Sequence, residues 1–130
     1  MTFLLQFGDL FFLVFHAVFT LFNALGWIWK KTRRLNLCTL LLTAASWLGL
    51  GIFYGIGYCP FTDWHYRILY KLGHDHLPYS YIQYAVERLT GLHPPAELTQ
   101  IVTVAALCIA LICSCFLNYR DWKVKQRDLE

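Results

Sequence analysis

Charged side chains are scarce in this chain. Asp, Glu, Lys and Arg together make up 15% of its 130 residues, whereas hydrophobic residues make up 58% and aromatic residues 18%. A water-soluble domain of this length carries more charge and less apolar surface. The composition therefore excludes an ordinary soluble domain and favours a single membrane domain over residues 1–130.

Familiar catalytic and nucleic-acid-binding motifs are missing. The sequence has no CxxC pair, no HExxH pair, no phosphate-binding loop, no nucleotide fingerprint and no catalytic serine elbow. No RNA- or DNA-binding motif is present either, so we attribute the formal charge of +3 to contact with anionic lipid. The sequence thus assigns no enzymatic activity, no cofactor and no nucleic-acid partner.

The start of the chain also lacks the basic residues of a secretory signal peptide. Its first apolar run has no Lys or Arg ahead of it and is too long for the apolar core of such a peptide. We therefore expect the amino-terminal segment to remain in the mature protein.

Long apolar runs are abundant by contrast, at about 4–29, 35–58 and 97–118. A helix rises about 1.5 Å per residue, so each run can cross a hydrocarbon core of about 30 Å. Basic residues cluster between Lys30 and Arg34 and again between Arg120 and Arg127. Because cytoplasmic flanks retain Lys and Arg, the amino terminus is predicted outside and the carboxyl terminus in the cytoplasm.

The connection between the second and third runs contains no apolar segment long enough to span the membrane. Its helical periodicity predicts an amphipathic helical hairpin over about 62–92 on the outer side. Thr62 is predicted to cap the first helix, and Ser80 and Gln83 to cap the second, which ends at Gly91. The membrane-facing stripe is assigned to Trp64, Ile68, Leu69 and Leu72, and the water-facing side to His65, Arg67 and Lys71. The predicted fold is all-α: an integral membrane bundle of three transmembrane helices plus this hairpin.

Polar side chains recur every seven residues along the first run, at Asp9, His16 and Asn23. Two helical turns return each of them to nearly the same face, so they form one polar stripe. Unpaired polar groups are costly inside a membrane, and we expect the stripe to face protein. It indicates a proton relay, a ligand site or an axial haem ligand; the alternative is interhelical hydrogen bonding that determines packing.

Two glycines four residues apart, Gly51 and Gly55, form a GxxxG pair in the second run. Such a pair allows another helix backbone to approach closely. We interpret it as a helix-packing face, either within the chain or against a second copy or another membrane protein.

Histidine and cysteine provide weaker signals. His74 and His76 are weak candidates for metal ligands, because their spacing in a predicted turn matches no established signature, and no metal site is assigned. The cysteines suggest no disulfide pair, although Cys59 lies at the predicted outer boundary.

Several segments resemble a small bacterial membrane family known as domain of unknown function 2784. The resemblance covers nearly the whole chain and depends on Gly8–Asp9 with His16, the basic turn ending at Arg34, Trp47 with its following glycines, and the stretch 57–62. That stretch is similar to the family's CPLT-type motif, with Phe61 where Leu is usual. The resemblance implies a multi-pass protein of the bacterial cytoplasmic (inner) membrane and no established activity.

Asp9 and the 59–62 stretch lie at the same predicted side of the membrane. We therefore predict a polar pocket open to the outside, lined by Asp9, His16, Asn23, Cys59, Pro60 and Thr62, with Glu87 or Arg88 closing it. The leading functional hypothesis is a non-enzymatic accessory component of a membrane assembly, in contact with the lipid bilayer. The alternatives are a binder of haem or another small ligand, and a proton-coupled enzyme or carrier.

Overall fold

The computed structural model describes residues 2–130, and helices account for most of them. The segments are α1 (Thr2–Leu25), α2 (Arg33–Ala45), the π-helical turn η1 (Ser46–Leu50), α3 (Gly51–Tyr54), α4 (Pro60–Lys71), α5 (Tyr81–Thr90) and α6 (Ala96–Leu129). Residues 2–130 contain no β-strand, so the all-α prediction is confirmed.

Three helical segments are long and apolar enough to cross a membrane, as predicted: Thr2–Leu25, Arg33–Tyr54 and Ala96–Leu129. Their large apolar side chains mostly point away from the rest of the protein. Phe3 is 76% exposed, Phe53 80% and Ile112 69%. Apolar surface on this scale is unfavourable in water and is solvated by acyl chains in a bilayer.

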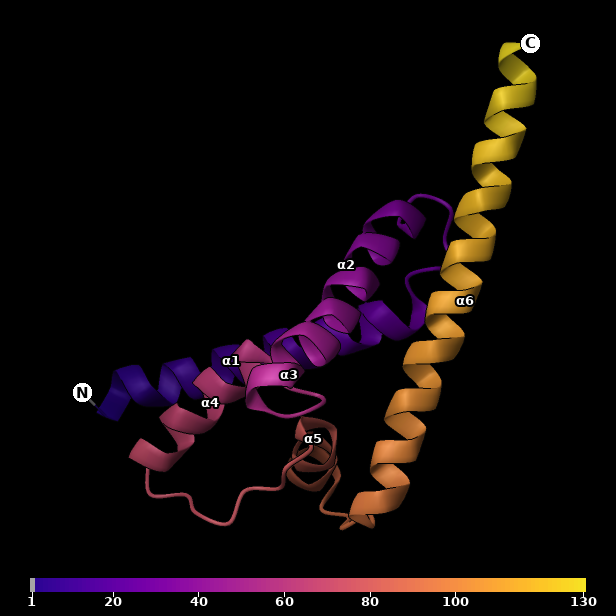
Figure 1. Ribbon diagram of the computed structural model, residues 1–130. Coiled ribbons are helices and arrows are strands. Elements are labelled where there is room, and N and C mark those ends of the chain that lie inside the picture. Colours follow the sequence, from indigo (N-terminus) through magenta and orange to yellow (C-terminus); the bar gives the residue numbers. More distant parts are fainter. Residues whose placement is uncertain (1) are drawn as a thin grey trace.

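The helices meet in two places. The turn between α1 and α2 lies against α6, which runs steeply across the α1–α2 pair (Figure 1). At the other end of the molecule, α4 packs along α1, while α5 lies between α4 and the amino-terminal end of α6 (Figure 1). A buried core of Leu13, Leu69, Tyr81 and Tyr84 joins α1, α4 and α5.

α6 is longer than the predicted third span. Its start at Ala96, directly after Pro95, agrees with the expected beginning of that span, but it continues to Leu129. With 34 residues it is about 51 Å long at 1.5 Å per residue, well beyond the hydrocarbon core of about 30 Å. The charged end of α6 therefore extends past the apolar stretch that ends at Leu117.

The second apolar segment ends earlier than predicted, at Tyr54. Gly55 has φ 111° and lies outside the helix, so the prediction that Gly51 and Gly55 share one helical face is wrong. A Cβ on Gly51 would lie 3.0 Å from the Cα of Ile56, where the chain folds back over the helix end. This contact is tight, so a side chain at Gly51 would require the backbone at Ile56 to shift by a few tenths of an ångström.

Two short helices occupy the region of the predicted hairpin. α4 begins at Pro60 with Cys59 as its N-cap, so the prediction that Thr62 caps it is wrong. Proline is favoured in the first helical turn because it has no N–H to leave unpaired. α5 begins as predicted, with the Ser80 side chain accepting from the Gln83 N–H, and ends at Gly91 with φ 75°.

Candidate functional site

A group of polar side chains, most of them buried or half-buried, lies where α1, α4 and α5 meet. Asp9 comes from α1, His65 from the middle of α4, and Tyr81, Tyr84 and Arg88 from one face of α5. Residues three, four or seven apart lie on the same side of a helix, which explains why α5 presents all three side chains together. We call these five residues the Asp9 cluster.

Arg88 and Asp9 form a two-pronged ion pair. Arg88 Nη1 lies 2.6 Å from Asp9 Oδ1, and Nη2 lies 2.9 Å from Oδ2. The Asp9 side chain is 14% exposed and that of Arg88 is 34% exposed. The hydrogen bonds from Arg88 to Asp9 raise the pKa of Arg88 above its usual value, so the guanidinium is charged throughout the accessible pH range.

His65 connects Asp9 to Tyr81. Its Nε2 lies 2.7 Å from Asp9 Oδ1 and its Nδ1 lies 2.7 Å from the Tyr81 hydroxyl oxygen, and its side chain is completely buried. Burial lowers the pKa of His65 below its usual 6.5, so the ring is neutral at pH 7. Because the ionised carboxylate can only accept, Nε2–H donates to Asp9 and Nδ1 accepts from Tyr81 O–H.

The tyrosines complete the hydrogen bonding of the cluster. Arg88 Nη1 also donates to the Tyr84 hydroxyl oxygen at 2.7 Å. Burial raises the pKa of both Tyr81 and Tyr84, so both remain protonated donors at neutral pH. The cluster can therefore hold one proton on His65 and one on each tyrosine, with a single carboxylate charge balanced by Arg88.

Aromatic rings enclose the cluster. The ring of His16 stacks on that of Tyr81 with centroids 3.9 Å apart and planes 12° apart. Phe12 stacks on His65 from the other direction, with centroids 5.9 Å apart. The Nδ1 atom of His16 is buried and has no hydrogen-bond partner among residues 2–130. His16 thus adjoins the Asp9 cluster through its ring face, and its buried Nδ1 has no partner there.

The predicted site residues separate into two groups. Asp9 and Arg88 are directly paired, and His16 contacts the same cluster through Tyr81. Asn23 lies 14 residues beyond Asp9 on α1, about 21 Å along the helix at 1.5 Å per residue. There it donates to Thr43 Oγ1 at 2.9 Å, in a separate polar contact between α1 and α2.

The other predicted pocket residues lie outside the hydrogen bonds of the Asp9 cluster. Cys59 and Pro60 form the start of α4, and Thr62 is half-buried in its first turn. The carboxylate of Glu87 accepts from Gln83 Nε2 at 3.4 Å and lies 3.7 Å from His93 Nδ1. Of the two α5 candidates for closing the site, Arg88 rather than Glu87 reaches Asp9.

His74 and His76 lie in the exposed connection between α4 and α5. The His76 side chain is 94% exposed, and its nearest carboxylate is that of Asp75 at 3.9 Å. Among residues 2–130, no group of three or more His, Cys, Asp or Glu side chains is arranged to hold a metal ion.

Sequence reasoning missed His65, Tyr81 and Tyr84. The prediction that His65 faces water is wrong, because its side chain is completely buried. Leu69, four residues further along α4, was predicted to face the membrane and is also completely buried, because positions i and i+4 share a helical face. That periodicity places His65 on the same helical face as Leu69 and could have identified it as buried. The polar character of histidine led instead to the prediction that it faces water.

A comparison with known protein families identifies the chain's relatives. Residues 6–119 match the model of the family described as Protein of Unknown function (DUF2784), and the chain belongs to this family. No curated protein and no solved structure matches the chain.

Proposed function

We propose that the protein is a non-enzymatic component of a membrane assembly, and that the Asp9 cluster holds α4 and α5 as a rigid docking unit. One observation carries this proposal: both oxygens of Asp9 are occupied, by His65 and by the two prongs of Arg88. A carboxylate used in this way joins three helices and has little capacity left for a substrate. We call α4, α5 and their connection the α4–α5 unit.

The α4–α5 unit carries several large side chains that the protein does not cover. Trp64 is 50% exposed, Tyr70 55% and Tyr79 69%. Leu89 in the last turn of α5 and Leu92 just after that helix are exposed to a similar degree. Aromatic residues are enriched where proteins meet partners, and a rigid backbone lowers the entropic cost of docking. These features support a protein partner at the α4–α5 unit.

Photo-crosslinking in the native membrane tests the proposal. A photoreactive phenylalanine analogue at Tyr70 or Tyr79 should give one discrete protein adduct, the same from both sites. The matched control is the analogue at Val102 of α6, which is 57% exposed in a candidate span and should label lipid. In Arg88→Lys the protein adduct should weaken, since the α4–α5 unit loses its bidentate attachment. Lipid adducts alone at Tyr70 and Tyr79 would exclude the proposal.

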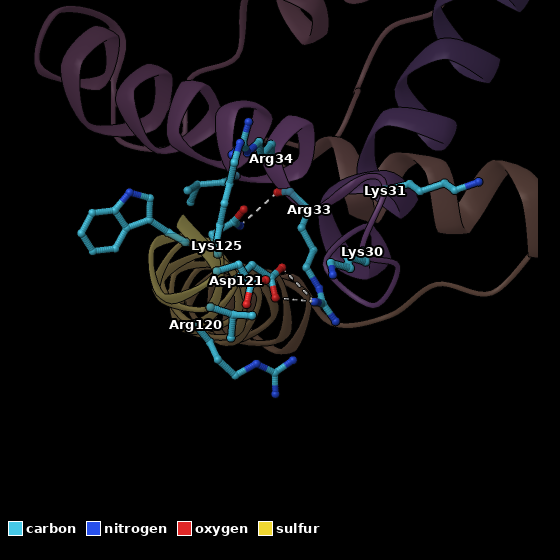
Figure 2. A pocket seen from close by; sticks show the side chains of 12 residues that line it. Lys30, Lys31, Arg33, Arg34, Arg120, Asp121 and Lys125 are labelled. Carbon is cyan, nitrogen blue, oxygen red and sulfur yellow. Dashed lines mark hydrogen bonds and ion pairs between the residues drawn. The ribbon is translucent and has the colours of Figure 1, made fainter. Parts of the chain in front are cut away.

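We further propose that the protein resides in the bacterial cytoplasmic membrane with its amino terminus outside and its carboxyl terminus in the cytoplasm. Both basic clusters support this topology, because side chains of the Lys30–Arg34 turn and of the last part of α6 line the same groove (Figure 2). The α4–α5 unit would then lie on the outer side. Single-cysteine labelling at Tyr79 and at Lys125 in intact cells tests the arrangement, with labelling expected only at Tyr79.

A second candidate, a small-ligand binder or proton-coupled carrier or enzyme, is favoured by one observation. His16 is 9% exposed and its Nδ1 has no partner, although a buried polar atom normally has one. A ligand that hydrogen-bonds to His16 would satisfy this atom. Haem has less support, since both nitrogens of His65 are already engaged and His74, His76 and His93 are exposed.

His16→Ala distinguishes the two candidates. A docking protein should keep its cellular phenotype and its adduct at Tyr70 in this variant, because His16 makes no hydrogen bond within the Asp9 cluster. A carrier or enzyme should lose its phenotype at normal membrane levels. A Soret band in the purified wild type that disappears in His16→Ala would identify haem as the ligand of the second candidate.

A further inference from the structure

A groove of about 930 Å³ lies between the α1–α2 turn and the last part of α6 (Figure 2). This volume falls in the range of about 300–1,000 Å³ that is typical of small-molecule sites. The groove is remote from the Asp9 cluster, which lies at the junction of α1, α4 and α5. It is independent of the docking function proposed above.

Basic side chains dominate the lining of the groove. Those without a carboxylate partner among residues 2–130 are Lys30, Lys31, Arg34, Arg120 and Lys125. The acidic lining residues are Asp121, which pairs with Arg33, and Asp128. Figure 2 shows Lys31 and Arg120 extending outward, where they contribute to the rim. So many like charges repel one another unless an anion lies among them.

The walls of the groove are held together by specific contacts. Arg33 Nη1 lies 2.9 Å from Asp121 Oδ2 and 3.2 Å from Oδ1 (Figure 2). Asn118 Nδ2 also donates to the backbone oxygen of Arg33 at 3.1 Å. The Arg33 side chain is 13% exposed and that of Asp121 is 27% exposed, so solvent screens this pair less than a surface pair. The groove is therefore a persistent feature of the packing between two segments 88 residues apart.

The depth of the groove indicates what kind of anion it receives. α1 ends at Leu25, α2 begins at Arg33, and the apolar stretch of α6 ends at Leu117, so three apolar segments stop at the same level. Trp122, which is 52% exposed, also lines the groove. Tryptophan favours the headgroup region, where its ring meets acyl chains and its N–H meets water. The basic groove thus lies where phospholipid phosphates lie.

We infer that this groove binds the headgroup of an anionic phospholipid, with its phosphate among Lys30, Arg34 and Lys125. The neighbouring acyl chains would lie along the exposed apolar side of α6, which continues from the groove through Phe116 and Ile112. A zwitterionic lipid carries a compensating ammonium group and gains less from these cations.

Titration of the purified protein with lipid, read by native mass spectrometry, tests the inference. The wild type should bind phosphatidylglycerol more tightly than phosphatidylcholine. Arg120→Gln combined with Lys125→Gln should weaken phosphatidylglycerol binding about thirtyfold. The matched control is Lys123→Gln combined with Arg127→Gln, which removes the same charge from the same helix at positions that do not line the groove. The control should change the dissociation constant less than about threefold.

Other outcomes would overturn the inference. Equal weakening by both double variants would show general attraction to charge, and equal affinity for the two lipids would show no headgroup site. Displacement of phosphatidylglycerol by millimolar inorganic phosphate would identify a soluble phosphate ligand instead of a lipid. If the variant with Arg120→Gln and Lys125→Gln does not purify in folded form, Arg34→Gln tests the opposite wall of the groove. This single variant should weaken phosphatidylglycerol binding about fivefold. An unchanged affinity would contradict the inference.

Discussion

Arg88 and Asp9 are 79 residues apart in the chain, and their side chains form two parallel hydrogen bonds of 2.6 and 2.9 Å. The pair joins the amino-terminal half of the first candidate span to the last turn of α5. Because His65 donates to the same carboxylate, one side chain of α1 is hydrogen-bonded to both short helices.

Arg88→Lys should lower the free energy of unfolding by about 1–2 kcal/mol. Lysine retains the charge but presents a point charge in place of the planar fork, so it cannot reproduce both hydrogen bonds to Asp9 and the one to Tyr84. Unfolding in detergent, followed by thermal or denaturant titration, measures the change. Arg67→Lys is the control: its side chain is 71% exposed in a pair with Asp63, and the effect there should stay below about 0.5 kcal/mol. Equal effects at the two sites would contradict the role assigned to Arg88.

Tyr81→Phe should destabilise the protein by about 1–3 kcal/mol, because it removes the donor to buried His65 Nδ1 and leaves that nitrogen unsatisfied. The ring that stacks on His16 is retained, so the packing volume hardly changes. Tyr70→Phe, at a position 55% exposed on α4, should have an effect within about 0.5 kcal/mol. A neutral result for Tyr81→Phe would mean that the His65–Tyr81 hydrogen bond contributes nothing to stability.

Acidification should destabilise the protein through His65. Its pKa is lowered in the folded state, so below 6.5 the unfolded chain binds a proton that the folded one excludes. The stabilisation is present above the usual pKa and is lost as the pH falls toward the folded value, with a slope of at most about 1.4 kcal/mol per pH unit for one proton. Unfolding midpoints at about pH 7.5 and about pH 5.5 should therefore differ.

The pH dependence can be assigned with a variant that does not titrate. In His65→Gln the amide can still donate to Asp9 and accept from Tyr81, so the difference between the two midpoints should shrink. His76→Gln, whose side chain is 94% exposed in the native protein, should leave the difference unchanged. Identical pH profiles for the wild type and His65→Gln would rule out His65 as the titrating group.

Gly26→Ala should cost about 1–3 kcal/mol, because the new Cβ would lie 2.6 Å from the Phe22 backbone oxygen and 2.8 Å from Asn36 Nδ2. The clash would displace the buried Asn36 amide, which donates to the same Phe22 oxygen at 2.7 Å. The matched control is Gly49→Ala, where a Cβ meets no atom within 4 Å. Its unfolding free energy should stay unchanged or rise by up to about 1 kcal/mol. A tolerated alanine at Gly26 would show that the α1–α2 turn adapts easily.

The sequence was sufficient where a local property decides the outcome. Apolar runs of the required length predict helices that can span a bilayer, because every backbone polar group must be paired within the segment. The N-cap of α5 at Ser80 and its end at Gly91 were also predictable from the sequence, because each depends on one residue and its immediate neighbours. Asp9 and His16 were recognisable as polar side chains in apolar surroundings, whereas Arg88 was only one of two alternatives beside Glu87.

The tertiary structure alone determined which side chains meet. Asp9 pairs with Arg88 rather than Glu87, and His65 is buried rather than hydrated, because α4 and α5 dock on α1 with one particular rotation. Gly55 lies outside the helix in which it was predicted, because the chain folds back after Tyr54. Helical periodicity shows which residues share a face, but it does not show which neighbour that face contacts. That choice depends on the packing of segments far apart in the chain, which no local pattern encodes.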